Sequence, residues 1–113
     1  MEIIKDEITI EKLKTIAEGM FGNLVKAVVD VEKGIMAIGG ELHADEEAML
    51  LENESEQKNL WGINIYPDIK GNDWIEFDSM INLRPSQGNR SRSVDNPEIQ
   101  KKIIEIVNKL VKK

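Results

Sequence analysis

The sequence has no cysteine, one histidine, three prolines, and only two Trp, one Tyr and two Phe among its 113 residues. Without cysteine no disulfide framework can form, and the single histidine excludes the usual structural zinc sites. No apolar run exceeds about four residues, whereas a membrane-spanning helix needs ~20. The N-terminus becomes acidic at Glu2 and lacks an apolar signal core, so we expect a cytoplasmic protein.

What is present fits one globular domain over residues 1–113, with 41% apolar and 32% charged residues. The net charge of −6 is unevenly distributed. Residues 1–80 carry −11 and residues 81–113 carry +5. An acidic chain repels phosphate backbones, so a nucleic-acid ligand is disfavoured unless the basic part acts alone.

The first half of the chain predicts a strand, a helix and a hairpin. A weak apolar pattern indicates a short strand within residues 3–8. Thr9 is a suitable N-cap for a helix that Gly22 would end. The β-branched runs at residues 25–31 and 35–38 flank a short glycine-containing turn, which is typical of a β-hairpin.

The second half predicts a short helix at residues 43–51, begun by His43 or Asp45, and then two strands. The strands are expected at residues 60–66 and 74–83, the second being the longest in the chain. An Asx cap and a proline within residues 95–98 mark the start of a last helix, which an apolar stripe continues to the C-terminus.

These elements predict an α+β fold. We expect an antiparallel sheet of about four strands, with the N- and C-terminal helices packed on one face and a short helix after the first hairpin. In the strand at 74–83, alternation would turn one set of side chains to the core: Ile75, Phe77, Ser79, Ile81 and Leu83. Trp74, Met80 and the polar side chains would then face solvent.

The solvated face is the first candidate site. If the strands at 60–66 and 74–83 pair, it gathers amides, a phenol, carboxylates and a guanidinium: Asn64, Tyr66, Glu76, Asp78, Asn82 and Arg84. Such a mixture is used in binding concavities, but it also forms structural networks on antiparallel sheets. The residue types are compatible with both interpretations.

A second cluster surrounds the only histidine. Glu41, His43 and Asp45 could hold a divalent cation, since oxygen ligands favour magnesium or manganese. His43 and Asp45 could instead act with Glu76 and Asp78 in catalysis. The alternative is structural, with Asp45 capping the helix, Glu46 and Glu47 supporting its dipole, and His43 bonded to a backbone carbonyl. The spacing matches no known metal motif.

The third candidate is the polar, arginine-containing loop from Arg84 to Arg92. Asn89, Arg90 and Arg92, together with Arg84, could hold a phosphate or carboxylate, because guanidinium groups fit oxyanions well. Alternatively the loop pairs with the acidic part of its own chain, with Arg84 facing Glu76 or Asp78.

Several longer strings carry a resemblance to a known family. They are His43-Ala44-Asp45-Glu46-Glu47, Leu60-Trp61-Gly62-Ile63-Asn64-Ile65-Tyr66-Pro67, Trp74-Ile75-Glu76-Phe77-Asp78-Ser79-Met80-Ile81-Asn82-Leu83-Arg84-Pro85 and Gly88-Asn89-Arg90-Ser91-Arg92. The chain resembles a family of small prokaryotic proteins known only as a domain of unknown function. The resemblance implies a stand-alone cytoplasmic domain from a bacterium or archaeon, and it implies no activity, substrate or cofactor.

Three functions follow from these candidates. The leading hypothesis is an interaction module that uses the polar sheet face and the arginine loop to hold a protein partner or a small anion. The alternative is a small metal-dependent hydrolase with a His/carboxylate centre, the only reading that needs a divalent metal cofactor. A nucleic-acid-binding regulator is disfavoured by the charge, and an exposed edge strand could support a homodimer.

Overall fold

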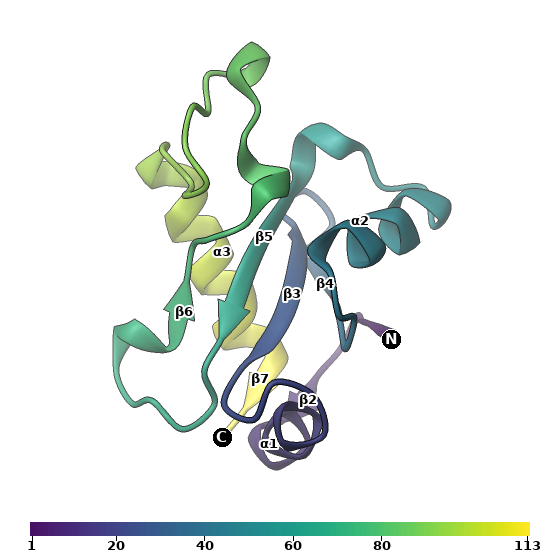
Figure 1. Ribbon diagram of the computed structural model, residues 1–113, viewed down its shortest axis with the longest axis vertical. Helices are drawn as coiled ribbons and strands as arrows, with labels where there is room; N and C mark the ends of the chain where they lie inside the picture. Colours follow the sequence, from purple (N-terminus) through teal and green to yellow (C-terminus); the bar gives the residue numbers. More distant parts are fainter.

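The fold is built on a five-stranded antiparallel sheet with α-helices on both faces (Figure 1). The computed structural model describes residues 1–113. The sheet has the order β1-β4-β3-β5-β6, with strands Glu2–Ile4, Ile35–Ile38, Val25–Asp30, Leu60–Ile65 and Ile75–Glu76 respectively. The helices are α1 (Ile10–Glu18), α2 (His43–Glu52) and α3 (Pro97–Leu110). None of them combines the length and the apolar character needed to cross a membrane.

A separate parallel pair joins the two ends of the chain. β2 (Ile8–Thr9) lies beside β7 (Val111–Lys112), with Ile8 opposite Val111. The α+β prediction is confirmed, with one more strand in the main sheet than the four expected.

The predicted hairpin is confirmed as β3 and β4. Asp30 shapes its turn, because its Oδ1 accepts hydrogen bonds from the backbone N–H groups of Glu32 and Lys33, both at 2.9 Å. Its Oδ2 accepts one from the Ser55 hydroxyl at 2.7 Å. The three hydrogen bonds satisfy this buried carboxylate and indicate that Asp30 has a structural role in the turn.

The helix starts agree with the sequence in two cases of three. The side chain of Thr9 caps α1, and that of Asn96 caps α3. α1 ends at Glu18, earlier than the predicted stop at Gly22. For α2 the predicted caps, His43 or Asp45, are wrong: Leu42 occupies the N-cap and offers no side-chain hydrogen bond.

The sheet has a core on each face. On one face α1 and α3 cover the alternating apolar residues of β3, β4 and β5, as predicted. The other face was expected to be solvated, and that prediction is wrong. There Val28, Ala37 and Leu60 pack with Leu50 of α2 in a second buried cluster.

The long strand predicted at 74–83 is also wrong. Only Ile75 and Glu76 pair with β5, and the chain then crosses the second face through a 3₁₀ turn, Met80–Asn82. Asn82 explains the departure, since its side-chain amide accepts from the N–H of Gly62 at 2.8 Å and donates to the carbonyl of Gly62 at 2.9 Å. One side chain thus replaces the strand partner that Gly62 would otherwise need. Trp74, expected on the solvated face, is the last residue of a 3₁₀ turn, Asn72–Trp74, and is buried in the main core.

This crossing requires Gly62. A Cβ at this position would lie 2.5 Å from Cβ and 2.6 Å from Oγ of Ser79, which is itself buried. We expect Gly62→Ala to destabilise the protein by about 1–3 kcal/mol, because neither β5 nor the crossing segment can yield without losing hydrogen bonds. Urea unfolding measures the change.

Gly19→Ala is the matched control. Gly19 has helical backbone angles, and a Cβ there would be 3.7 Å from its nearest neighbours. This variant should stay within about 1 kcal/mol of the wild type. An equal loss in both variants would contradict the close contact between β5 and the crossing segment.

Candidate functional site

α2 turns polar as well as apolar side chains toward the sheet. His43, Glu46 and Leu50 recur at three- and four-residue intervals, so they share one helix face. All three are buried, although the two polar ones would normally be placed on the solvent side. α2 packs on β3 and β4 and also contacts the 3₁₀ turn at 80–82.

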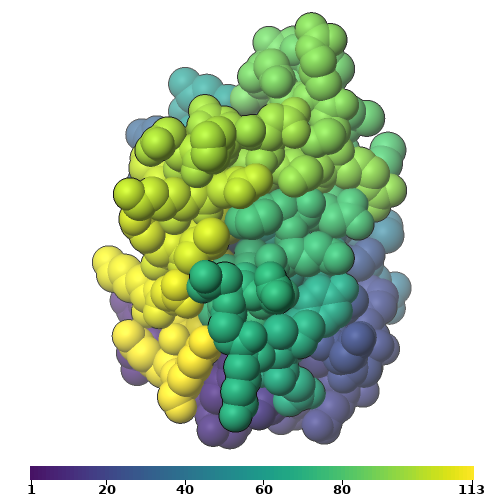
Figure 2. All heavy atoms as spheres, turned by 90° about the vertical axis from the view of Figure 1, so that its left-hand side faces the viewer, coloured from purple at the N-terminus to yellow at the C-terminus, as the bar shows by residue number.

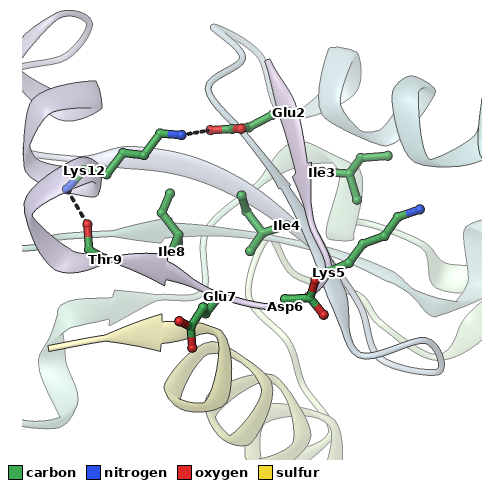
Figure 3. A pocket seen from close by; sticks show the side chains of 9 residues that line it. All are labelled: Glu2, Ile3, Ile4, Lys5, Asp6, Glu7, Ile8, Thr9 and Lys12. Carbon is green, nitrogen blue, oxygen red and sulfur yellow. Dashed lines mark hydrogen bonds and ion pairs between the residues drawn. The ribbon is translucent and has the colours of Figure 1, made fainter.

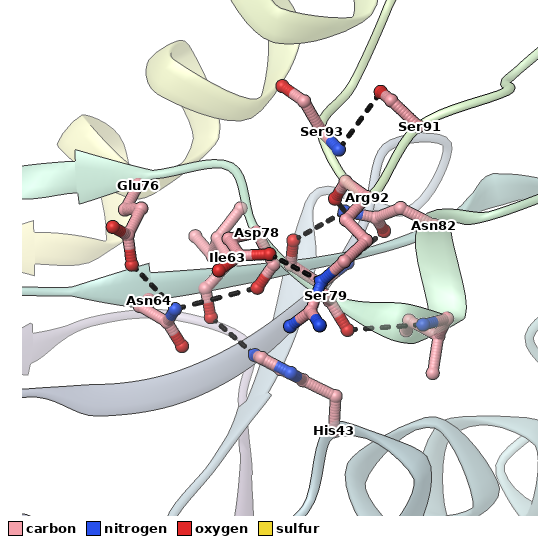
Figure 4. A network of polar contacts seen from close by, with 12 residues as sticks. His43, Ile63, Asn64, Glu76, Asp78, Ser79, Asn82, Ser91, Arg92 and Ser93 are labelled. Atoms are coloured by element: carbon pink, nitrogen blue, oxygen red, sulfur yellow. Dashed lines mark hydrogen bonds and ion pairs between the residues drawn. The ribbon is translucent and has the colours of Figure 1, made fainter.

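His43 reaches from α2 to β5 (Figure 4). Its Nε2 lies 2.8 Å from the carbonyl of Ile63, and because a carbonyl can only accept, Nε2 carries the proton. This confirms the predicted bond from His43 to a backbone carbonyl. Burial lowers the pKa of His43, and the charges of Lys26 and Arg92 lower it further, against the Ile63 hydrogen bond and Asp78. The neutral ring therefore keeps Nδ1 as a hydrogen-bond acceptor, without a partner in the protein.

Glu46 is the most deeply buried ionisable side chain in this region, with no exposed surface. Its Oε2 accepts from the N–H of Gly40 at 3.0 Å, and Oε1 has no partner. Burial raises the pKa of Glu46 to about 9, against the opposing effects of the Gly40 hydrogen bond and Lys26. The side chain is therefore protonated at neutral pH.

Two adjoining pockets lie at the N-terminal end of α2. The smaller, of about 190 Å³, lies between the start of α2 and the 3₁₀ turn, and the larger, of about 410 Å³, continues toward the end of α1. They share Lys26 and Leu42. We call the two together the α2 groove.

The α2 groove has two basic side chains, Lys26 and Arg92, and one acidic side chain, Glu41, in its lining. The neutral ring of His43 lines the smaller pocket together with the two basic side chains. The first N–H groups of α2 also open here, because Leu42 provides no cap, and the positive end of the helix dipole favours anions.

Lys26 is the basic group of the groove that lacks a counter-ion. Of the two partly buried lysines, Lys14 pairs with Asp68, whereas Lys26 forms no ion pair. Its Nζ instead lies 5.0 Å from the centre of the Phe21 ring. Arg92 is already paired, with Nε 2.8 Å from Oδ1 of Asp78. Lys26 is thus available to an anion from outside.

A polar network borders the groove along β5 and β6 (Figure 4). Glu76 Oε1 accepts from Asn64 Nδ2 at 2.8 Å and from the Tyr66 hydroxyl at 3.1 Å. Burial and the Glu76 carboxylate raise the pKa of Tyr66. The structure thus brings Asn64, Tyr66 and Glu76 together, and Asp78 joins them through the contact of its carbonyl with Asn64.

Arg84 lies apart from this network. Its guanidinium is buried over the Trp61 ring, 4.1 Å from the ring centre, and donates to the carbonyls of Gln57 and Leu60. Burial lowers its pKa. The predicted pairing of Arg84 with Glu76 or Asp78 is therefore wrong, because the strand that would have aligned them ends at Glu76.

The rest of the arginine loop is held from within. Asn89 is buried and its Nδ2 donates to the carbonyls of Asn82, Ser91 and Ser93. Arg90 is exposed, and its N–H donates to Asp95. The segment around residues 83–90 forms the projection at the top of the molecule in Figure 1 and Figure 2. Of the loop's basic side chains, Arg92 alone lines the α2 groove.

The carboxylates of the predicted metal centre do not gather. Glu41 and Asp45 are exposed, and no group of three or more His, Asp or Glu side chains could hold a metal ion. Asp78 is close enough to His43 to affect its pKa, but its carboxylate is paired with Arg92. The arrangement offers an anion the unpaired Lys26 and the start of α2, and it does not offer a cation a set of ligands.

The largest pocket, of about 540 Å³, lies along β1 and β2 (Figure 3). Its ionic side chains have both signs, and Lys12 reaches across to Glu2, with Nζ 3.3 Å from Oε1. Lys5, Asp6 and Glu7 are exposed. With no buried polar group awaiting a partner, this pocket is the weaker candidate despite its size.

Sequence reasoning missed Lys26 and gave Glu46 only a supporting role. Lys26 interrupts the apolar run of the first hairpin strand, and Glu46 lies three residues after His43 and four before Leu50. For Glu46 the available signal was its helical spacing from the apolar Leu50. Lys26 gave no such signal, because alternation places it opposite Val25, Ala27 and Val29, on the face that was expected to be solvated.

Comparison with known proteins identifies the family. The chain belongs to the family described as "Protein of unknown function (DUF5674)", whose sequence pattern matches residues 2–110. No curated protein and no solved structure matches the chain.

The buried Glu46 predicts a pH-dependent stability. Its folded pKa of about 9 exceeds the ordinary value of 4.5, so between these values the folded state binds the extra proton. Its contribution to stability is then complete at low pH and falls as pH rises, by up to ~1.4 kcal/mol per unit. Urea unfolding at about pH 6 and about pH 8.5 should show this loss in the wild type.

Glu46→Gln removes the titrating group and keeps its shape, so the stability should fall less over the same interval. Glu52→Gln, at an exposed position near the end of α2, is the control and should keep the wild-type dependence. A Glu46→Gln variant with an unchanged dependence would show that the carboxyl is ionised in the folded protein.

Proposed function

We propose that this member of the family is a non-catalytic binding domain, and that its α2 groove holds an anionic group of a protein partner or small ligand. The observation that carries the proposal is Lys26, a partly buried cation without a counter-ion beside the uncapped start of α2. Keeping a charge partly buried and unpaired costs free energy. A bound carboxylate or phosphate would offset that cost.

The groove also supplies the geometry that anion recognition uses. Free backbone N–H groups at a helix start donate to an oxyanion, and the side chains of Lys26 and Arg92 add charge from two other segments. The net charge of −6, and Glu41 in the lining of the larger pocket, favour a ligand that is anionic only at one end.

The hydrolase alternative has less support. It required Glu41, His43 and Asp45 to meet Glu76 or Asp78. Glu41 precedes α2 and Asp45 lies on its exposed side, so neither side chain reaches the others. The binding hypothesis keeps its ligand class but moves from the polar sheet face to the α2 groove. A cytoplasmic, prokaryotic setting remains part of the proposal.

Inorganic phosphate is a suitable probe. Titrated into ¹⁵N-labelled protein at constant ionic strength, it should shift the amide resonances of His43 and Ala44, with a Kd on the order of millimolar as expected for a single small anion. Lys26→Met should weaken this binding by ~10-fold or more, since a charged hydrogen bond is lost while the aliphatic stem is kept.

Lys70→Met is the control, because Lys70 is exposed and lines neither pocket of the groove. It should leave the phosphate titration unchanged. Equal weakening by both substitutions, or shifts centred on the start of α3, would refute a specific site in the α2 groove.

A further inference from the structure

The hydrogen-bond acceptor of His43, Nδ1, restricts the chemistry of the ligand further than the requirement for an anionic group does. The side chain is nine-tenths buried, lines the groove, and has its Nε2 occupied by Ile63. Its free Nδ1 can only accept, whereas Lys26, Arg92 and the helix N–H groups can only donate. A ligand that satisfies all of them carries an anion and, close to it, an N–H or O–H donor.

The rim of the groove is apolar. Leu42 and Met80 are 56% and 61% exposed, and Met20 and Phe21, at the far end, are 38% and 43% exposed. The chain has eight large apolar residues this exposed, and four of them surround this groove. Exposed apolar side chains gathered in one place mark a binding surface, and methionine adapts to partners of different shape.

The dimensions of the groove fit a chain better than a compact molecule. The pocket beside His43 measures about 190 Å³, below the ~300–1,000 Å³ of sites for whole small molecules. The adjoining pocket of about 410 Å³ extends the space past Lys26 toward Phe21. One residue would fit beside His43, and the residues before it would continue along the groove.

From these three observations we propose that the ligand is the C-terminal end of a peptide chain whose last residue is apolar. Its carboxylate would meet Lys26 and the start of α2, its last amide N–H would donate to Nδ1 of His43, and its side chain would pack on Leu42 and Met80. Capture of a terminal carboxylate by backbone N–H groups is an established mode of peptide recognition. This inference rests on the proposed function and names its ligand class.

The test uses the intact protein and an acetylated pentapeptide without charged side chains, Ac-Ala-Gly-Ser-Gly-Leu, whose free carboxylate is its single charge. By calorimetry or NMR, it should bind at least ~10-fold more tightly than inorganic phosphate, because it makes further contacts. The same peptide with a C-terminal amide should lose ~10-fold or more in affinity. Equal binding of acid and amide would overturn the proposal.

Two ligand variants test the remaining contacts without altering the fold. An ester in place of the last amide removes the donor to His43, and should weaken binding several-fold and abolish the shift that the peptide causes at the Nδ1 resonance of His43. Replacing the last leucine by glycine should also weaken binding several-fold. If either change has no effect, the corresponding contact does not exist and the proposal fails.

Protein variants locate the apolar contact. Met80→Gln should reduce the preference for leucine over glycine, while Leu51→Gln, at another exposed apolar position, should not. N-acetyl-leucine serves as a separate arm: if it binds as tightly as the pentapeptide, the ligand is a free acylated amino acid rather than a chain end, which overturns the peptide assignment.

The outcomes also separate this inference from the proposed function. Phosphate binding that depends on Lys26, without tighter binding of the peptide, would leave an anion site and refute the peptide assignment. Absence of both would refute the proposed function itself.

Discussion

The second face of the sheet depends on one side chain, the amide of Asn82. The side chain of Asn82 hydrogen-bonds both the N–H and the carbonyl of Gly62, so β5 needs no further strand beside it at this position. The same two bonds fix the segment that crosses the second face of the sheet. The Nδ2 atom of Asn82 also donates to the carbonyl of Arg92, so the start and the end of the arginine loop meet at the same amide. The crossing segment forms one wall of the α2 groove. The shape of the groove therefore depends on the hydrogen bonds of the Asn82 amide.

The opposite wall is set by α2, and the interior beneath it is unusually polar. His43 and Glu46 are both buried in uncharged form, each with one hydrogen bond to a backbone group. Apolar side chains of similar size would remove the desolvation cost, so these polar residues reduce the stability of the fold. Such costs are typical of positions kept for recognition rather than for packing.

The elements predicted correctly are those with local signals. Thr9 and Asn96 cap their helices through bonds within a few residues, and the hairpin turn is shaped by Asp30 a few residues away. The alternation at 74–83 gave a wrong strand because the preference of Asn82 for Gly62, 20 residues away, outweighs it. For the same reason the sequence indicated the chemical types of the candidate site, Arg92 and His43 among them, but missed Lys26 and the position of the groove. Contacts between residues far apart in the sequence, such as that of Asn82 with Gly62, cannot be predicted from the spacing of neighbouring residues.

The parallel pair of β2 and β7 joins segments from opposite ends of the described chain. Closing so long a loop has a high entropic cost, which is repaid only after the intervening sheet has formed. We therefore expect this pair to form late in folding and to be among the first contacts to open. β2 leads directly into α1, and α1 ends just before Met20 and Phe21 at the far end of the groove. Separation of β2 from β7 would therefore loosen that end of the groove while leaving β5 and the amide of Asn82 in place.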